Sequence, residues 1–272
     1  MSMPRPRAYP ADPSPAPVPP GTRTVLAHRG AAALAPENTV AAFRRAAQEG
    51  AQWVELDVDV IADGTLIVIH DSRLDRTTNR TGSYYDLAAT DLAAIDAGAW
   101  FTADDGTHPY VGEPLPTLDA VLDVVAEYGL AVNVELKSCQ AGAVACRRLV
   151  DGVADRLDRH AERSGADVIV SSFNPLLLER MRQRRPGTDL ALLTDSRLLT
   201  DDWRSYVEQL GAVAVNPSDA YLTRERVEEI RSLGYGVNVW TVNSRERAQE
   251  LFDWGVTGIF TDRVHEMGAL HR

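Results

Sequence analysis

Residues 54–60 read VELDVDV, a stretch in which the acidic residues Glu55, Asp57 and Asp59 alternate with aliphatic ones. Because successive side chains of a β-strand point to opposite faces, the three acids share one face and the aliphatic residues share the other. On a surface strand this alternation is ordinary. In a buried strand it directs acid toward the protein interior, so its meaning depends on the fold that the neighbouring segments form.

Seven further short apolar runs have the character of strands, and amphipathic segments separate most of them. The eight predicted strands cover residues 24–28, 53–58, 131–136, 168–172, 189–194, 212–216, 236–241 and 257–261. Residues 117–128 and 244–254 carry apolar side chains at helical spacing, and Ser244 is in position to cap the second of these helices. Eight strand–helix units predict an α/β fold, a (β/α)8 TIM barrel. An open doubly wound sheet is the alternative, disfavoured because no glycine-rich loop follows the first strand.

The chain divides into a short tail and one predicted barrel domain. Residues 1–22 hold eight of the fifteen prolines and lack the apolar run of a signal peptide, which predicts a disordered tail. Residues 23–272 are predicted to form a single barrel, a fold of typically about 250 residues. Within it, residues 62–71 follow the second strand through an Asp-Gly turn and predict a hairpin. Residues 72–115 form a predicted small insertion, and a loop of this length is usually functional. Because it leaves from the C-terminal side of the second strand, we expect it to lie over the barrel mouth.

Composition narrows the class of partner. The net charge is −11, and no basic face is evident, so nucleic acid is not expected as a partner. The two cysteines, Cys139 and Cys146, do not indicate a disulfide framework. No stretch approaches the ~20 apolar residues of a transmembrane helix, and we expect a cytoplasmic protein. No pattern favours a particular oligomeric state.

Polar residues gather at the predicted C-terminal ends of the strands, where barrels of this type carry their active sites. The first strand ends with His28 and Arg29, and the hairpin after the second strand ends with His70 and Asp71. The seventh strand ends with Trp240. Because all these ends meet at one face of a barrel, we expect the side chains to surround one site.

Two neighbouring strands direct acids into the same predicted interior. The third strand continues into NVELK (133–137), so Glu135 shares a face with Lys137. Several carboxylates in one confined site cannot all ionise without a cation, since like charges raise each other's pKa. Oxygen ligands without cysteine suit a hard ion, so Glu55, Asp57 and Glu135 predict one divalent cation: Mg²⁺, Ca²⁺ or Mn²⁺. The alternative is a salt-bridged network with Lys137 and Arg29.

The remaining residues suit a bound phosphoryl group. Arg29 offers a planar fork of donors, and Lys137 offers a compact positive charge. Histidine is the side chain whose ordinary pKa lies closest to neutral pH, so one of His28 and His70 could act as base and the other as acid. Together with a cation acting as Lewis acid, these parts predict metal-assisted cleavage of a phosphodiester.

Nine motifs, in order and at consistent spacing, make the sequence resemble the glycerophosphodiester phosphodiesterase family, the bacterial single-domain type. The resemblance runs from about residue 24 to residue 265. The motifs are AHRG (27–30), PENT (36–39), VELDV (54–58), DGTLIVIHD (63–71), LDRTTNRTG (74–82), PLPTLDAVL (114–122), NVELK (133–137), SSFNP (171–175) and WTVN (240–243). The resemblance implies a barrel catalytic domain that hydrolyses glycerophosphodiesters, such as glycerophosphocholine, to an alcohol and glycerol 3-phosphate.

The resemblance also implies residue roles. It assigns the metal to Glu55, Asp57 and Glu135, acid–base catalysis to His28 and His70, phosphate contacts to Arg29 and Lys137, and an aromatic wall beside the glycerol to Trp240. Asn38 could be the N-cap of the first helix, since Asn is common there. Asp59 is expected to lie outside the metal's first shell and close to solvent. Asp71 is expected either to orient His70 or to cap the turn that follows it.

Two other functions share this barrel. One is a lyase resembling phospholipase D that closes a cyclic phosphate, although such relatives usually look secreted and carry disulfides. The other is a catalytically silent barrel that binds glycerophosphodiesters. A silent barrel would be expected to have lost a histidine or a metal carboxylate, and this chain retains all of them.

Overall fold

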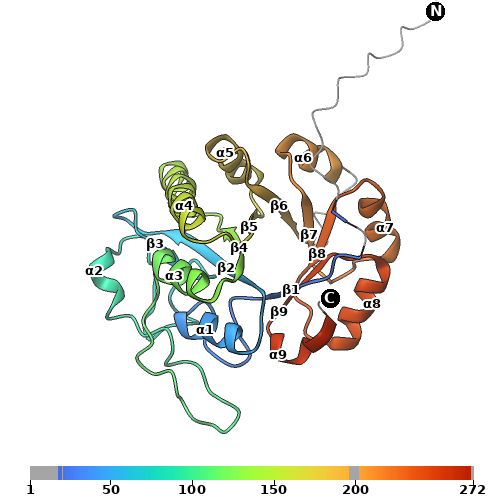
Figure 1. Cartoon of the computed structure of the whole chain (residues 1–272). Coiled ribbons are helices and arrows are strands. Elements are labelled where there is room, and N and C mark those ends of the chain that lie inside the picture. The colour runs from blue at the N-terminus through green and yellow to red at the C-terminus, as the bar shows by residue number, and fades with distance from the viewer. Residues whose placement is uncertain (1–17, 20, 196–201, 271–272) are drawn as a thin grey trace, which may run out of the picture.

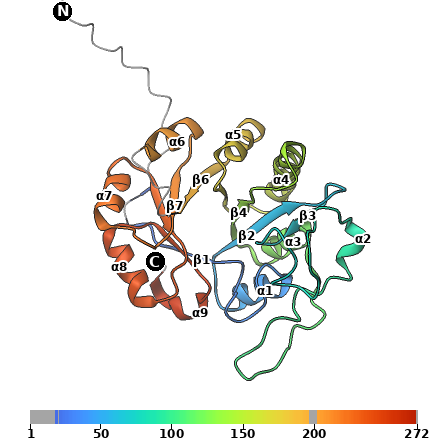
Figure 2. The ribbon, with the colours of Figure 1, turned by 180° about the vertical axis from the view of Figure 1, so that it is seen from behind.

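A computed structural model describes residues 18–19, 21–195 and 202–270 of the chain. Within these ranges, eight parallel strands close into a TIM barrel, and helices surround it (Figure 1; Figure 2 shows the opposite side). The barrel strands are β1 (Thr24–Ala27), β2 (Trp53–Val60), β4 (Ala131–Leu136), β5 (Val168–Ser172), β6 (Asp189–Thr194), β7 (Ala214–Pro217), β8 (Gly236–Val239) and β9 (Gly258–Thr261). The predicted fold is therefore confirmed, and the doubly wound alternative is wrong.

The helices follow the strands along the chain. They are α1 (Val40–Gln48), α2 (Ala89–Leu92), α3 (Leu118–Tyr128), α4 (Ala143–Arg163), α5 (Pro175–Arg184), α6 (Trp203–Leu210), α7 (Arg224–Ser232), α8 (Arg245–Trp254) and α9 (Val264–Met267), followed by a 3-10 turn, η1 (Gly268–Leu270). Local sequence sets several of their starts, because the hydroxyls of Thr39, Thr117, Thr223 and Ser244 each accept a backbone hydrogen bond from the first turn.

The register of β2 against β4 brings the acids of the two strands together. Asp57 lies directly beside Glu135 in this parallel pair, and Glu55 lies beside Asn133. The alternate aliphatic side chains of both strands are buried in one large apolar cluster with the surrounding helices. The acidic face of β2 therefore points into the barrel, where parallel barrels usually pack branched aliphatic side chains.

The hairpin predicted after β2 is present, with β3 (Leu66–Val68) running antiparallel to it. The insertion that follows lies beside this hairpin, together with α2 (Figures 1 and 2). It has an apolar cluster of its own, in which Ile67 and Ile69 of the hairpin pack with Leu92 and Ile95. This cluster anchors the insertion to the edge of the barrel without using the barrel core.

The predicted domain boundaries stay a prediction. Residues 1–17 and 20 of the proposed tail lie outside the described residues. Val18, at its end, donates a backbone hydrogen bond to the carbonyl of Gly234. Cys139 and Cys146 are both free thiols. In the described part of the chain, no helix is both long and apolar enough to cross a membrane, and the cytoplasmic location stays a prediction.

Candidate active site

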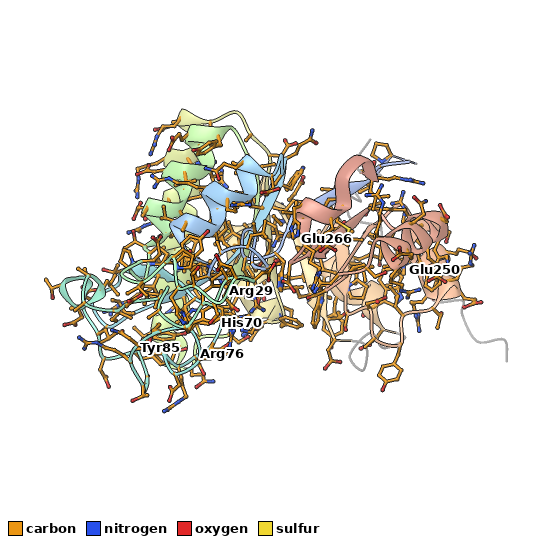
Figure 3. All side chains as sticks on the ribbon, turned by 90° about the horizontal axis from the view of Figure 1, so that it is seen from below. Arg29, His70, Arg76, Tyr85, Glu250 and Glu266 are labelled. Atoms are coloured by element: carbon orange, nitrogen blue, oxygen red, sulfur yellow. The ribbon has the colours of Figure 1, made fainter. Side chains whose placement is uncertain are left out.

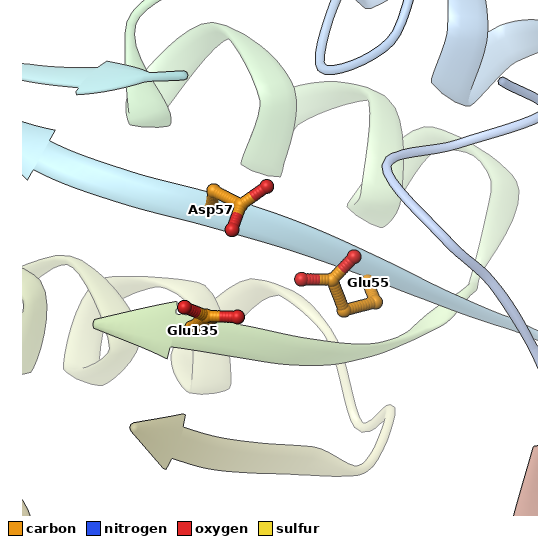
Figure 4. A group of neighbouring side chains, drawn as sticks. All are labelled: Glu55, Asp57 and Glu135. Atoms are coloured by element: carbon orange, nitrogen blue, oxygen red, sulfur yellow. The ribbon is translucent and has the colours of Figure 1, made fainter. Parts of the chain in front are cut away.

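Three buried carboxylates form the centre of the site. Glu55 and Asp57 extend from β2, Glu135 extends from β4, and their carboxylates turn toward one another (Figure 4). Each can offer an oxygen atom such that the three atoms lie within 4.8 Å of one another. Asp57 is 1% exposed and Glu55 2% exposed, so water screens their negative charges poorly.

Two cations neutralise part of this charge. The Nζ atom of Lys137 donates to Asp57 Oδ1 at 3.1 Å and to Glu135 Oε1 at 2.7 Å. The Nε atom of Arg29 lies 3.3 Å from Asp57 Oδ2. Despite the cost of burial, Lys137 and Arg29 together hold the pKa of Asp57 well below its usual range.

Glu55 lacks such a partner. Its Oε2 atom accepts a hydrogen bond from the backbone N–H of Arg29 at 2.9 Å, but among the described residues no lysine or arginine side chain forms an ion pair with it. Burial, and then the charges of Asp57 and Glu135, raise the pKa of Glu55 well above its usual range. Burial and the neighbouring Asp57 likewise raise the pKa of Glu135 to about 7.

The salt-bridged network expected as an alternative is therefore present but incomplete. It includes Asp57 and Glu135, but among the described residues it forms no ion pair with Glu55. Three carboxylates with close oxygen atoms match the ligands that hard divalent ions prefer. The residues present thus fit the predicted cation. Such a cation would give the carboxylate of Glu55 a positively charged partner.

Each of the two candidate histidines is held by a carboxylate. The Nδ1 atom of His28 lies 2.7 Å from Oδ1 of Asp262, and that of His70 lies 2.7 Å from Oδ1 of Asp71. Asp262 is itself fixed by Asn243, whose Nδ2 donates to it at 2.7 Å. Because Nδ1 of each ring is engaged, Nε2 is the atom left for a substrate.

Burial is the main cause that lowers the pKa of His70, and the positive charges of Lys137 and Arg29 act in the same direction. The charge of Asp57 opposes them, as does the hydrogen bond to Asp71. His70 is thus favoured in its neutral form near pH 7, which is the form that can accept a proton.

The predicted residues surround two adjoining cavities. A cavity of about 320 Å³ is lined by His28, Arg29, Glu55, His70, Glu135 and Trp240. A second, of about 630 Å³, is lined by His70, Glu135 and Lys137. Asp57 is not among the residues that line these two cavities. A larger cavity of about 1040 Å³ begins at the first residues of several strands, at the opposite end of the barrel, and includes none of these groups. That end of such barrels is not where chemistry takes place.

Trp240 forms an aromatic wall of the smaller cavity. Its ring meets that of Phe173 edge to face, with the centroids 5.5 Å apart. Its Nε1 donates to the backbone carbonyl of Asn216 at 2.9 Å, which fixes the plane of the indole. A fixed apolar surface of this kind suits the carbon skeleton of a small polyol.

Two expectations from the sequence are wrong. The N-cap of α1 is Thr39, whereas Asn38 turns its amide to Asp57, donating from Nδ2 at 2.8 Å and accepting from the Asp57 backbone. Asp59 is buried rather than close to solvent, and it accepts hydrogen bonds from the hydroxyls of Tyr84 and Tyr85, each at 2.7 Å. The insertion covers Asp59 through Tyr84 and Tyr85. Asp59 is therefore in a different environment from Glu55 and Asp57, which face Glu135.

Sequence patterns alone assign no role to Asp262 or Asn243, although both hold His28 in place. Asp262 directly follows β9 at the barrel mouth, so its place after a strand is a usable signal. Of the two roles expected for Asp71, the structure shows the contact with His70.

A barrel mouth that gathers acids, cations and carboxylate-held histidines around one cavity suits an anionic ester, so fold and site define a barrel enzyme of phosphate-ester chemistry. The sequence model of the glycerophosphoryl diester phosphodiesterase family matches residues 28–266. The chain belongs to this family and is a phosphodiesterase.

Named relatives and a solved structure support the same family. The chain is 33% identical to a glycerophosphodiester phosphodiesterase of Bacillus subtilis (strain 168) over 246 residues, covering 87% of this chain and 82% of that protein. A glycerophosphodiester phosphodiesterase of Caldanaerobacter subterraneus is 34% identical, covering 88% and 93%. A solved Oleispira antarctica phosphodiesterase in complex with the product sn-glycerol-3-phosphate is similar with a TM-score of 0.84 and 28% identity, covering 92% of this chain and 96% of that one.

The raised pKa values predict how stability depends on pH. A carboxyl whose folded pKa is raised stabilises the fold below its unfolded pKa, about 4.3 for Glu, and that contribution is lost as pH rises through the folded pKa. Chelated protein should therefore melt at a lower temperature at pH 8 than at pH 5.5. Added Mn²⁺ should raise the melting temperature by more at pH 8 than at pH 5.5. Thermal unfolding with EDTA or MnCl₂ measures both.

Glu55→Gln is the matched variant for this measurement, because it keeps the shape of Glu55 and removes its titration. It should reduce the pH-dependent loss in the chelated protein and the gain from Mn²⁺. An Mn²⁺ effect of equal size at both pH values, or one unchanged by Glu55→Gln, would contradict the assignment of the cation to these carboxylates.

Proposed function

We propose that this phosphodiesterase hydrolyses glycerophosphodiesters to an alcohol and glycerol 3-phosphate, with one divalent cation and with His28 and His70 as the acid–base pair. One observation carries the proposal: the buried carboxylate of Glu55 has no cationic partner among the described side chains, and it faces the same cavity as both histidines. A cation placed there would lie where a phosphate ester can reach it.

Glu55, Asp57 and Glu135 would hold the cation. When bound, it would polarise a phosphate oxygen as a Lewis acid. Arg29 and Lys137 would bind the remaining negative charge of the phosphodiester, and both already lie in the walls of the two adjoining cavities. Their positive charges also stabilise the charge that builds up on the phosphoryl oxygens as the ester bond breaks.

The histidines would move the protons. One Nε2 removes a proton from the oxygen that attacks phosphorus, and the other donates a proton to the alcohol oxygen as its bond to phosphorus breaks. Asp71 and Asp262 would hold the two rings in the tautomer that leaves Nε2 available. The proton that one ring gains and the proton that the other ring loses balance, and exchange with solvent returns each ring to its starting state before the next turnover.

Trp240 would support the glycerol, because it forms the apolar wall of the cavity that also holds His28 and Glu55. The Oleispira antarctica relative was solved with its product sn-glycerol-3-phosphate, which is also the product expected from this chemistry. The second cavity, which shares His70 and Glu135, would take the alcohol portion of the substrate.

Product analysis tests this reaction. Protein incubated with glycerophosphocholine and Mg²⁺, Ca²⁺ or Mn²⁺ should release glycerol 3-phosphate, and EDTA should abolish the release until metal is restored. Phosphorus-31 NMR distinguishes this product from a cyclic phosphate. Accumulation of the cyclic phosphate would support a lyase instead, whereas activity that survives exhaustive chelation would remove the metal from the mechanism.

Variants of the histidines test the acid–base assignment. His28→Ala and His70→Ala should each lower kcat by about 10²-fold or more, the range of general acid–base catalysis. His108→Ala is the matched control, because His108 lies in the insertion and contacts the carbonyl of Phe101. Near-normal turnover by either active-site variant would show that the histidine has another role.

A further inference from the structure

Arg76, a residue of the insertion, contacts the carboxylate that orients His70. Its Nε and one terminal nitrogen donate to the two oxygens of Asp71, at 2.8 and 2.9 Å. The Asp71 oxygen that receives the terminal nitrogen is Oδ1, the same atom that contacts His70 Nδ1. Arg76 and His70 therefore share one oxygen atom.

The same guanidinium also holds a second carboxylate. Its terminal nitrogens donate to Oε2 and Oε1 of Glu37, at 2.6 and 2.8 Å. Glu37 Oε1 accepts in turn from a terminal nitrogen of Arg29 at 2.7 Å. One planar group thus makes two bidentate pairs, with Asp71 and with Glu37, and each of these carboxylates contacts a residue with a proposed role in the reaction. Figure 3 labels Arg76, Arg29 and His70 on the same side of the molecule.

We propose that Arg76 is a positioning residue that fixes His70 and Arg29 relative to each other through Asp71 and Glu37. This inference rests on the proposed function. Arg76 reaches the ring of His70 through Asp71 and the guanidinium of Arg29 through Glu37. Its side chain also lines the second cavity beside His70. A planar fork with fixed donors restricts both carboxylates at once, which a single ammonium cannot do.

An ordinary surface ion pair is the competing explanation, since Arg76 is 44% exposed and exposed pairs contribute little to stability. The pattern of shared oxygens argues against it. A pair that served only to fold the insertion would not need to end on the oxygens that hold His70 and Arg29. Catalysis is sensitive to displacements that stability hardly registers, because misplacing a reacting group by ~1 Å can cost about 10²-fold in rate.

The two histidines differ in what holds their carboxylates. Asp71 is shared with the cation Arg76, whereas Asp262 is shared with the neutral amide of Asn243. Arg76 therefore withdraws part of the negative charge of Asp71 from His70. Among the described residues no arginine forms an ion pair with Asp262, on which Arg29 acts only at longer range. Loss of Arg76 should affect His70 selectively.

The experiment compares Arg76→Met, Arg76→Lys and the control Arg80→Met. Arg80 belongs to the same insertion and is exposed, and its side chain takes part in none of the ion pairs formed by the described residues. With glycerophosphocholine as substrate, Arg76→Met should lower kcat by about 10-fold or more, with a smaller change in KM. Arg76→Lys should not restore kcat, whereas Arg80→Met should behave as the wild type.

A second readout does not depend on activity. Titration of the histidine rings by NMR, assigned with His70→Gln, reports the pKa of His70 directly. Asp57, Lys137, Arg29 and Asp71 act on this ring, and Arg76 lies behind Asp71. Glu55 and Glu135 line the same cavities as the ring. Removing Arg76 removes a positive charge and leaves Asp71 to His70 alone, so the pKa of His70 should rise in Arg76→Met while the titration of His28 stays unchanged.

Four outcomes would overturn the proposal: unchanged kcat and His70 titration in Arg76→Met, full kcat in Arg76→Lys, an equal loss in Arg80→Met, or a shift at His28 as large as at His70. A melting temperature measured for each variant separates loss of fold from loss of position. If wild-type protein shows no activity on glycerophosphodiesters, the proposed function fails, and the NMR titration still decides the role of Arg76.

Discussion

The parallel register of β2 and β4 is the constraint on which the site depends. It sets Asp57 beside Glu135 and turns Glu55 toward both inside the barrel. The opposite faces of the two strands are apolar. Burying three carboxylates so close together is costly, and the cost falls only if positive charge is supplied. Lys137 and Arg29 supply part of it. Glu55 has no such ion pair among the described residues, and the proposed divalent ion would be held there.

Around this centre, each group with a proposed chemical role is held by another. Asp262 and Asp71 hold the two histidines, and Asn38 holds Asp57 through both its amide atoms. Arg76 links the support of His70 to that of Arg29. Because Arg76 comes from the insertion, the geometry of the barrel mouth depends on how that insertion folds.

Much of this could be predicted from the sequence, because strand periodicity is local. The alternation in VELDVDV and NVELK is enough to identify both acidic strands and to place Glu55, Asp57 and Glu135 on the inner face of the barrel. The roles of Asn38 and Asp59 were mistaken because distant residues decide them. Asn38 adopts a left-handed conformation, with φ of 59°, and its amide reaches Asp57, while Tyr84 and Tyr85 of the insertion bury Asp59. The contact of His28 with Asp262 spans 234 residues, and no local pattern predicts it.

The position of a bound metal tests the central claim most directly. Crystals grown with Mn²⁺ and measured at its absorption edge locate the ion by anomalous scattering. The account predicts one strong peak with oxygens of Glu55, Asp57 and Glu135 each at a coordination distance of about 2.0–2.6 Å, the range of hard divalent ions. A peak elsewhere, or none beside these carboxylates at saturating Mn²⁺ and pH 8, would contradict it.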